Sequence, residues 1–405
     1  MRQDLTSIEF SLKALDHWID SNGFAGFDPY DIKAGPGMIR LIKSGNAHKM
    51  IAFFRELVFE MFYMAPLLFR RLSGIKPTIN AKAMGLFASA YLDLYLKYND
   101  VTCLRKAETC LLWLKENKNN LHKGTGWGYP FDWQSKKLIP AGTPNGIVTT
   151  AVGDAFWKHY QCSGDRESLD ICVQICEFLA SLPADNLSEN QICFSYTPLF
   201  INHVHNLNLF VAEFLIKTGM KTSQDAWIAL GNRAVNYTLS DQRADGSFDY
   251  NGPPEKPNHH CDNYHTGFVL RMLYAIWKLT GRKDVFDSLN KCYQHYVHSF
   301  FESNTIPKLM PDRKYRIDIH SCAESIHCLS ELSQLFPEGL GLAENILHWT
   351  IDNLQDKTGY FYYGIQKSRL TGLPFVSKIP YIRWGQAWML KALASYLSAA
   401  NSKKA

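Results

Sequence analysis

Polar and aromatic side chains recur at corresponding places in this 405-residue chain, each time just before a run of apolar residues. These places hold Thr149 and Thr150, His203 and His205, Tyr264 and His265, Asp318 and His320, and Arg383 with Trp384. Three of the five carry a histidine, although Ser, Asp and Asn cap helices better than histidine does. A single histidine of this kind is commonly a cap or a core residue, but the recurrence predicts one shared site with acid–base capacity.

Carboxylates form a second set of residues that could act as acids or bases. Asp154 and Glu324 each follow one of these helix starts by about a turn, where burial raises the pKa of a carboxyl group. Pairing with a nearby Arg or His is the ordinary alternative. The loops add Asp132, Asp249, Glu255 and Asp262. A glycosidase needs two such groups across the scissile bond, so this set of carboxylates leaves a hydrolase as an alternative function.

The stretch HHCDNYH, from His259 to His265, contains the ligand types that transition metals prefer. Its first two histidines and Cys261 are adjacent, however, so their side chains diverge, and no HExxH or paired CxxC supports them. No GxSxG, Walker loop or GxGxxG before a helix occurs either. We therefore expect neither a metal nor another cofactor.

The elements that position these residues repeat along the chain. One unit reads NYHTGFVLRMLYAIWKLTG and RKDVFDSLNKCYQHYVHSFF, which is an apolar helix, a turn with Gly281 and a second helix with apolar spacings of three and four. The same pattern predicts leading helices at 80–98, 146–160, 203–217, 264–279, 319–335 and 383–397. Their starts lie about 55 to 65 residues apart, which indicates repeated helical hairpins.

Following helices are predicted at 102–116, 166–181, 223–240, 283–301 and 341–354, one fewer than the leading helices. The amphipathic segment 7–20 supplies the sixth, because it ends in GFAGFDPYD much as the others end in DGSFDY or TGYFYY. We expect this N-terminal helix to pair with the C-terminal helix and close a ring. The predicted fold is an all-α (α/α)6 toroid of six helical hairpins in a single domain, 1–405, with an open solenoid as the alternative.

Parallel leading helices on the inner wall would open their N-termini at one end of the ring. The loops that reach this end include GWGYPFDWQ, with Trp127, Tyr129 and Trp133, and KLMPDRKYR, with Arg313 and Arg316. They are richer in aromatic and charged residues than the short turns at the opposite end, so we expect the site at this mouth. Helix N-termini and arginines direct positive potential into it, which suits an anionic ligand such as an acidic sugar.

The amino-acid composition limits the ligands and binding partners that we expect for this protein. A net charge of +5 is mild, and no run of five or six Lys or Arg occurs, so nucleic acid is not expected. The ten cysteines are scattered without a CxxC pair, and MRQDLTSIEF lacks the apolar core of a secretory signal, which together predict a cytoplasmic protein. Aromatic residues make up 13% of the chain and many fall in loops, which favours a stacking ligand such as a sugar.

One apolar segment does not fit the repeat. It begins at Lys49, ends at Leu72 and holds six aromatic residues, with an inserted helix expected at about 49–73. Arg55, Glu56 and Pro66 make it a poor membrane span. A helix at the membrane interface is one interpretation, which would make the protein membrane-peripheral, and packing across the toroid or at a homodimer contact is the other.

Several motifs together resemble one protein family. GWGYPFDWQ, TPNGIVTT, SYTP with HVHNLNL, DGSFDY, CDNYHTGFVL, IHSCAESIH and KIPYIRWGQAWML are similar to the VpsJ-type bacterial polysaccharide-biosynthesis proteins. The resemblance covers most of the chain beyond about Gly124. It implies an α/α toroid that makes or modifies an exopolysaccharide.

The ending YIRWGQAWML is also weakly similar to uronosyl C5-epimerases. This similarity implies proton abstraction beside a sugar carboxylate. Tyr264, His265 and Tyr381 would then be acid and base candidates, and Arg383 the carboxylate clamp. The implied stacking platforms are Trp127, Trp133 and Trp384.

The leading hypothesis is a carbohydrate-active enzyme of polysaccharide assembly that acts on an acidic, uronate-containing glycan by epimerisation or elimination. The glycan could be free or lipid-linked. The catalytic candidates are Tyr264, His265, Tyr381, Glu324, Asp154 and Asp262. The substrate-binding candidates are Trp127, Tyr129, Asp132, Trp133, His203, His205, Asp249, Arg316, His320, Arg383 and Trp384. A hydrolase or transglycosidase with two carboxylates and a non-catalytic glycan-binding scaffold are the alternatives.

Overall fold

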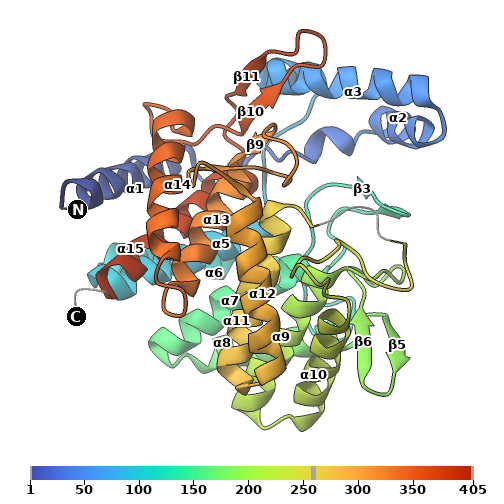
Figure 1. Ribbon diagram of the computed structural model, residues 1–405, viewed down its shortest axis with the longest axis vertical. Helices are drawn as coiled ribbons and strands as arrows, with labels where there is room; N and C mark the ends of the chain where they lie inside the picture. Colours follow the sequence, from blue (N-terminus) through green and yellow to red (C-terminus); the bar gives the residue numbers. More distant parts are fainter. Residues whose placement is uncertain (1, 257–260, 403–405) are drawn as a thin grey trace.

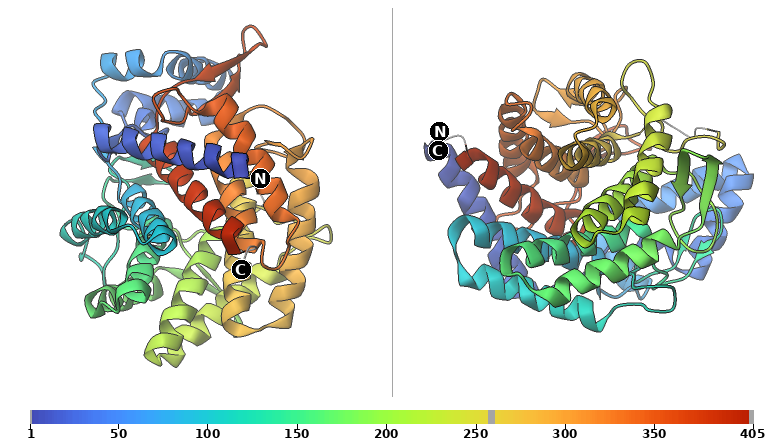
Figure 2. Two further views of the ribbon diagram at one scale, coloured as in Figure 1. Left: turned by 90° about the vertical axis from the view of Figure 1, so that its left-hand side faces the viewer. Right: turned by 90° about the horizontal axis from the view of Figure 1, so that it is seen from below.

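Twelve helices of the chain form two concentric rings. The fold is taken from a computed structural model that describes residues 2–256 and 261–402. The inner ring consists of α5 (Ala81–Tyr98), α7 (Gly146–Ser163), α9 (His205–Thr222), α11 (Asn263–Thr280), α13 (Ile319–Leu332) and α15 (Trp388–Ser402). Each inner helix packs against the next, and α15 packs against α5, so the ring is closed. Figure 2 shows the helices arranged around a common axis.

The outer helices pair with the inner ones. They are α6 (Val101–Glu116), α8 (Arg166–Ala180), α10 (Asp225–Ser240), α12 (Lys283–Ser299), α14 (Gly339–Leu354) and, from the other end of the chain, α1 (Arg2–Asn22). α1 packs against α15 through a buried face that includes Ile8, Leu12 and Leu15, and the Oγ of Ser11 donates to Gln355 at 2.8 Å. The predicted closure and the (α/α)6 toroid are therefore confirmed.

The starts of the inner helices are fixed by Asn and Asp caps rather than by the recurrent histidines. Asn80, Asn145, Asp262 and Asp318 accept backbone N–H groups in the first turns of α5, α7, α11 and α13. α9 begins without a side-chain cap. The histidines of α11 and α13 are thus free of a capping role, and a different reason is needed for their positions.

Short antiparallel strands shape the long loops at the end where the inner helices begin. They are β1 (Ala25–Gly26) with β2 (Thr78–Ile79), β3 (Trp133–Gln134) with β4 (Leu138–Ile139), β5 (Ala184–Ser188) with β6 (Gln191–Phe194), β7 (Phe301–Glu302) with β8 (Ile306–Pro307), and the sheet β11 (Pro374–Ser377), β10 (Gly364–Lys367), β9 (Ile317–Asp318). The opposite end has short turns, such as Gly164 and Gly281 in the left-handed conformation. One end of the ring therefore carries most of the variable surface.

A three-helix insert follows the first strand. The sequence predicted one helix that breaks at Pro66, and the structure has α3 (Lys49–Met64) followed by α4 (Pro66–Leu72), with α2 (Pro36–Ala47) before them. A separate small core of Ile32, Phe59 and Phe62 holds the insert together. In the described part of the chain, no helix has the length and apolarity needed to cross a membrane. The insert stands beside the toroid at the end with the long loops (Figure 1).

Close packing between inner helices depends on a small residue in α11. A Cβ added at Gly267 would lie 2.7 Å from Cγ of Glu324, on the neighbouring α13. Glycine at this position lets the carboxylate of Glu324 reach the guanidinium of Arg271, whose Nε lies 2.6 Å away. The ring interior is therefore built around buried charges as well as apolar contacts.

Candidate active site

A cavity of about 380 Å³ opens at the end of the ring where the inner helices begin. We call it the entry cavity. Eight of its lining residues were named as candidates from the sequence: Tyr129, Trp133, Glu255, Tyr264, His265, His320, Arg383 and Trp384. Apart from Glu255, they come from the first turns of α11 and α13, from the β3 loop and from the π-helical turn η2 (Ile382–Ala387). Segments far apart in sequence thus meet at the predicted mouth.

One wall of the entry cavity is a continuous aromatic surface. The ring of Tyr129 stacks on Phe131 with centroids 5.5 Å apart and an interplanar angle of 5°. Trp133 meets Tyr129 edge to face at 6.1 Å and Tyr196 at 5.7 Å. Flat apolar faces with polar edges suit the faces of a sugar ring.

His265 lies beside a carboxylate in the first turn of α11. Asp262 accepts the backbone N–H of His265 at 3.0 Å, and the same oxygen lies 2.9 Å from the ring Nδ1. The His265 ring centroid is 4.7 Å from that of Tyr250 and 4.3 Å from that of Tyr264. Nδ1 makes no hydrogen bond despite this short distance, but Asp262 places a carboxylate beside the ring, which suits His265 to act as a general base.

Tyr264 and His320 face each other inside the cavity with ring centroids 4.7 Å apart. Burial, reinforced by the charge of Asp262, raises the pKa of Tyr264 well above its ordinary value, so the phenol stays protonated. Burial and the positive charges of Lys82 and Arg383 lower the pKa of His320 well below its usual range. The cavity therefore contains a protonated phenol beside a neutral imidazole.

Lys82 forms part of the floor of the entry cavity. Its side chain is only 5% exposed, and its Nζ lies 5.4 Å from the ring centroid of Phe268 and 5.3 Å from that of Trp388. Desolvation and the nearby charge of Arg383 lower the pKa of Lys82 to about 7. Nζ makes no ion pair with any residue in 2–256 or 261–402. A buried ammonium without a partner carries an electrostatic cost that an anionic ligand would relieve.

Arg383, the predicted carboxylate clamp, already holds a carboxylate of the protein. Its Nε lies 2.6 Å from Asp28 Oδ2 and its Nη2 2.8 Å from Asp28 Oδ1, a buried bidentate pair in the wall of the cavity. The guanidinium carbon also lies 5.0 Å from the ring centroids of both Tyr129 and Trp384. Arg383 therefore positions aromatic rings, while Asp28 occupies the place expected for a substrate carboxylate.

Three further predicted residues lie behind the wall of the cavity. Tyr381 is fully buried and accepts a hydrogen bond from Arg70 at 2.8 Å. The indole N–H of Trp127 donates to a backbone carbonyl at 3.0 Å, and Arg316 donates to the hydroxyl of Tyr363 at 3.1 Å. The structure does not bring these side chains into the entry cavity, because each is used in holding a loop to the ring.

The other predicted loop residues also make contacts within the protein. His203 lies between Asp185 and Glu255, and His205 is 2.8 Å from Asp241. Asp132 accepts the backbone N–H of Ala141 at 2.7 Å, and both oxygens of Asp249 accept from Arg243. None of the four predicted residues lines the entry cavity as it is described.

The carboxylates required for glycoside hydrolysis are not paired in the entry cavity. Glu255 is the only carboxylate among the described lining residues. Burial raises the pKa of Glu255, but the hydrogen bonds from Lys136 and His203 outweigh burial and hold this pKa below its ordinary value. Glu324 lies behind the floor in its ion pair with Arg271, where burial raises its pKa to about 7. Two carboxylates facing one glycosidic bond are therefore absent from the described part of this cavity.

The predicted metal-ligand stretch is only partly described. His259 and His260 lie outside the described residues, so that part of the sequence interpretation stays untested. Among residues 2–256 and 261–402, no group of three or more His, Cys, Asp and Glu side chains is arranged to hold a metal ion.

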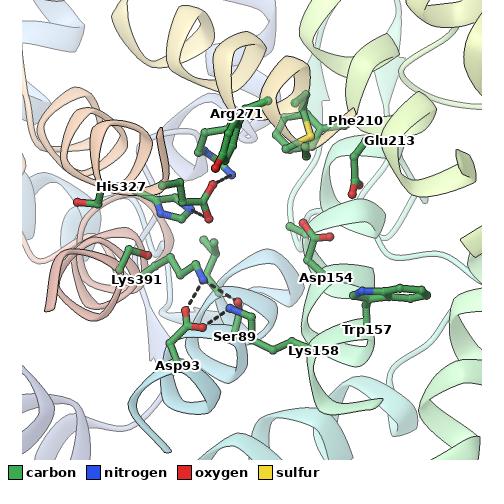
Figure 3. A pocket seen from close by; sticks show the side chains of 18 of the residues that line it. Ser89, Asp93, Asp154, Trp157, Lys158, Phe210, Glu213, Arg271, His327 and Lys391 are labelled. Carbon is green, nitrogen blue, oxygen red and sulfur yellow. Dashed lines mark hydrogen bonds and ion pairs between the residues drawn. The ribbon is translucent and has the colours of Figure 1, made fainter. Parts of the chain in front are cut away.

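A larger cavity of about 800 Å³ lies at the opposite end of the ring, where the inner helices end (Figure 3). We call it the exit cavity. Asp93 pairs with both Lys158 and Lys391, as the dashed lines in Figure 3 show. Lys217 pairs with Asp154 at 2.5 Å and with Glu213 at 3.1 Å. These charges of opposite sign are matched, whereas Lys82, which has no ion-pair partner among the described residues, lines this cavity as well as the entry cavity.

Asp154 thus lies at the end of the ring opposite to the predicted one. It is eight positions after Gly146, the first residue of α7, which carries it about two turns down the helix. The structure therefore separates Asp154 from Tyr264, His265 and Asp262, with which the sequence analysis had grouped it.

Several lining residues of the entry cavity were missed by the sequence analysis. They include Tyr30, Lys82, Tyr196, Asn206 and Tyr250. The sequence could have indicated Lys82, because it is a cation in the first turn of a helix whose other early residues are Ala, Met and Gly. For Tyr30 and Tyr250 the signal is weaker, because nothing in the local pattern separates a cavity tyrosine from a packed one.

Known structures with similar folds are carbohydrate-active enzymes. The cellobiose 2-epimerase of Bacillus thermoamylovorans B4167 matches with a TM-score of 0.61 and 11% identity over 79% of this chain and 87% of that one. The GH76 α-mannanase of Bacteroides thetaiotaomicron matches with a TM-score of 0.60 and 12% identity over 80% and 87%. The unsaturated glucuronyl hydrolase of Bacillus sp. GL1 matches with a TM-score of 0.54 and 11% identity over 76% and 84%.

At 11% to 12% sequence identity, the similarity to these structures shows a shared fold and nothing about a shared reaction. No protein-family model matches the sequence, and no curated protein matches it significantly. The chain therefore has the (α/α)6 toroid found in sugar epimerases and glycoside hydrolases, and its chemistry must be argued from its own residues.

Proposed function

We propose that this protein is a carbohydrate-active enzyme that removes a proton next to the carboxylate of a uronate residue in an acidic glycan. The observation that carries the proposal is the grouping of Lys82, His265 and Tyr264 in one aromatic-walled cavity that lacks a carboxylate pair. The resemblance to VpsJ-type proteins adds the expectation that the glycan belongs to a bacterial polysaccharide.

Each group has a distinct role in this reaction. Lys82 binds the uronate carboxylate and stabilises the negative charge that develops on it as the C5–H bond breaks. His265 takes the C5 proton on Nε2, and Asp262 beside Nδ1 stabilises the imidazolium. The electron pair of the broken C–H bond moves into the carboxylate to form an enolate.

The enolate has two possible fates. Return of a proton to the opposite face of C5 gives the epimer, and loss of the substituent at C4 gives an unsaturated sugar. Tyr264, which its raised pKa keeps protonated, is the proton donor in either case. Both fates share the first step, and the proposal concerns that step.

In this proposal the sugar lies between Lys82 and His265, and Lys82 extends from α5 to within 5.4 Å of the ring of Phe268 on α11. α5 and α11 are three positions apart in the closed ring of inner helices, so the two side chains come from opposite walls. The stacked rings of Tyr129 and Phe131 supply a lateral platform. A sugar bound on this platform with its carboxylate toward the floor would have C5 between the walls.

The test is incubation of the purified protein with acidic and neutral polysaccharides in deuterated water, followed by NMR. Solvent deuterium at C5 or an unsaturated product is the expected result with a uronate-containing glycan. New reducing ends without exchange would replace the proposal with a glycosidase. Binding without any reaction across the panel would replace it with a non-catalytic glycan-binding protein.

A further inference from the structure

The insert presents a continuous apolar face to solvent. On α3 the exposed side chains Met50, Phe53, Phe54, Met61 and Met64 recur at helical spacing along one side. From Met50 to Met64 this stripe is about 21 Å long at the rise of an α-helix. Leu67, Leu68 and Leu72 continue it on α4. We call these eight side chains the insert face.

The hairpin of β10 and β11 extends the insert face. Ser368 and the backbone N–H of Arg369 donate to the buried carboxylate of Glu60 on α3, and Ser377 donates to the carbonyl of Tyr63. The hairpin tip adds the exposed Leu370 and Leu373 and the neighbouring Val376. Of the 21 exposed large apolar side chains in the described chain, eight are in the insert face and three in this hairpin. Such a concentration marks an interaction surface.

The charges around the insert face have one sign. The exposed charged residues of segment 36–78 are Arg40, Lys43, Lys49, Arg71 and Lys76. The acidic residues of the segment are turned inward. Glu60 is buried under the hairpin, and Glu56 pairs with Arg55 and Arg369.

We propose that the insert face docks on the surface of an anionic lipid bilayer. An apolar stripe that enters the interface, bordered by Lys and Arg that meet anionic headgroups, is the pattern of a helix lying in a membrane surface. A second copy of this chain fits less well. In a two-fold dimer the same patch meets itself, so the five basic residues would face their own copies without an acidic partner.

Docking does not depend on the proposed reaction, although the buried side of the insert lies close to one wall of the entry cavity. Lys33, which precedes α2, has its Nζ 4.6 Å from the ring of Tyr30 in the entry cavity and 5.6 Å from the ring of Phe59 in α3. Phe59 is buried on the side of α3 opposite to the insert face, so the insert itself stands between a docked bilayer and the cavity.

The test is sedimentation of the full chain with vesicles of phosphatidylcholine alone and of phosphatidylcholine with phosphatidylglycerol. We expect the protein to sediment with the mixed vesicles and to remain in solution with the neutral ones. The Lys49→Glu/Arg71→Glu variant should bind the mixed vesicles at least about tenfold more weakly, whereas Lys123→Glu/Lys357→Glu, with the same change in net charge elsewhere on the surface, should change binding little.

The apolar part is tested separately. Phe53→Ser/Phe54→Ser should lower vesicle binding at least about tenfold, and Leu112→Ser/Met220→Ser, at exposed sites on α6 and α9, should leave it unchanged. Equal thermal midpoints for all four variants show that folding is intact. Failure to bind mixed vesicles, or equal losses in test and control variants, overturns the proposal. Dimers in light scattering that Phe53→Ser/Phe54→Ser dissolves, without vesicle binding, would assign the face to a second copy.

Discussion

The two ends of the ring are built from the same six inner helices, yet their cavities differ in how charge is balanced. At the exit cavity, Asp93 lies between two lysines, and Lys217 lies between two carboxylates. Lys82, which lines both cavities, has no ion-pair partner among the described residues. Each cavity also holds a buried histidine whose pKa lies well below its usual range, His320 in the entry cavity and His327 in the exit cavity. The exit cavity is the larger, at about 800 Å³ against about 380 Å³, so size does not identify the active end.

This difference separates structural charges from functional ones. A buried charge that is fully paired is stabilised by the protein itself, and a ligand has little to add. A buried cation that lacks a partner is held at a cost, and only a ligand or a reaction intermediate balances it. Because Lys82 lines both cavities, our proposal for the entry cavity rests on Tyr264, His265 and the aromatic wall, and variants at matched positions of the two ends can test that proposal.

Loss of the proposed base should give the largest effect. We expect His265→Ala to lower kcat by about 10²- to 10⁴-fold, because general-base catalysis is removed, with a small change in thermal midpoint. The matched variant His205→Ala, at a buried ring stacked on Tyr237 and paired with Asp241, should lower the thermal midpoint while kcat stays within a few-fold. Steady-state kinetics and calorimetry on both proteins make the comparison. Equal losses of kcat would erase the distinction between the two histidines.

Removal of the unpaired lysine, Lys82, should give the second largest effect. Lys82→Met should lower kcat/KM by about 10²- to 10³-fold, because an electrostatic contact to the enolate is lost. It should also raise the thermal midpoint by a few degrees at pH 7, since a buried charge without a partner is removed. Lys391→Met in the exit cavity, where Asp93 keeps Lys158 as a partner, should leave kcat/KM within a few-fold of the native value. A destabilised but active Lys82→Met protein would contradict the assignment.

The pH dependence of ligand binding follows from the same lysine. Burial lowers the pKa of Lys82 to about 7, so the ammonium is present below pH 7 and is lost above it. Affinity for a uronate oligosaccharide should therefore fall as the pH rises above 7, by at most about tenfold per pH unit. Titration calorimetry should show this slope in the native protein and none in Lys82→Met. An equal slope in both proteins would assign the titration to another group.

Folding stability should respond to pH through Lys82 in the opposite sense. Between pH 7 and its ordinary value of 10.5, this lysine is protonated in the unfolded chain and neutral in the folded one. The unfolded state then binds more protons, so the free energy of unfolding gains a contribution that rises with pH across this window. Denaturant titrations of the native protein and Lys82→Met should differ by this rise. A constant difference from pH 7 to 10 would mean that the pKa of Lys82 is not depressed.

The aromatic wall should give the smallest effect. Trp133→Ala is expected to raise KM roughly 2- to 10-fold with little change in kcat, because one stacking surface of the sugar platform is lost. Trp157→Ala, which removes an indole from the exit cavity, is the matched control and should change neither constant. A larger rise in KM for Trp157→Ala would place the sugar at the wrong end.

The fold, and the end of the ring where the long aromatic loops gather, could be predicted from the sequence because both depend on local periodicity. Six hairpins recur at a regular spacing, and the long aromatic loops all precede inner helices. Partnerships between distant residues could not be predicted. Arg383 meets Asp28 across 355 positions of sequence, and a pattern that identifies an arginine in a loop cannot show that its carboxylate is supplied by the protein.

The roles of single polar residues were the least predictable part. His265 and Tyr381 have similar sequence settings, each close to the start of an inner helix, yet one lines the cavity and the other is fully buried against Arg70. The difference arises from the insert, which contributes Arg70 and covers that side of the ring. A repeat pattern carries no information about an insertion that occurs only once.

Closure of the ring by its first helix also has a consequence for biosynthesis. The hydrogen bond from Ser11 to Gln355 spans 344 residues of chain, and the partner of α1 in the inner ring, α15, is synthesised later still. During translation the bonds of α1 with the first hairpin, such as those of Tyr91 and Lys106 with Asp16, can form early, whereas its packing against α15 must wait for the intervening hairpins. The ring therefore stays open until α15 has been synthesised.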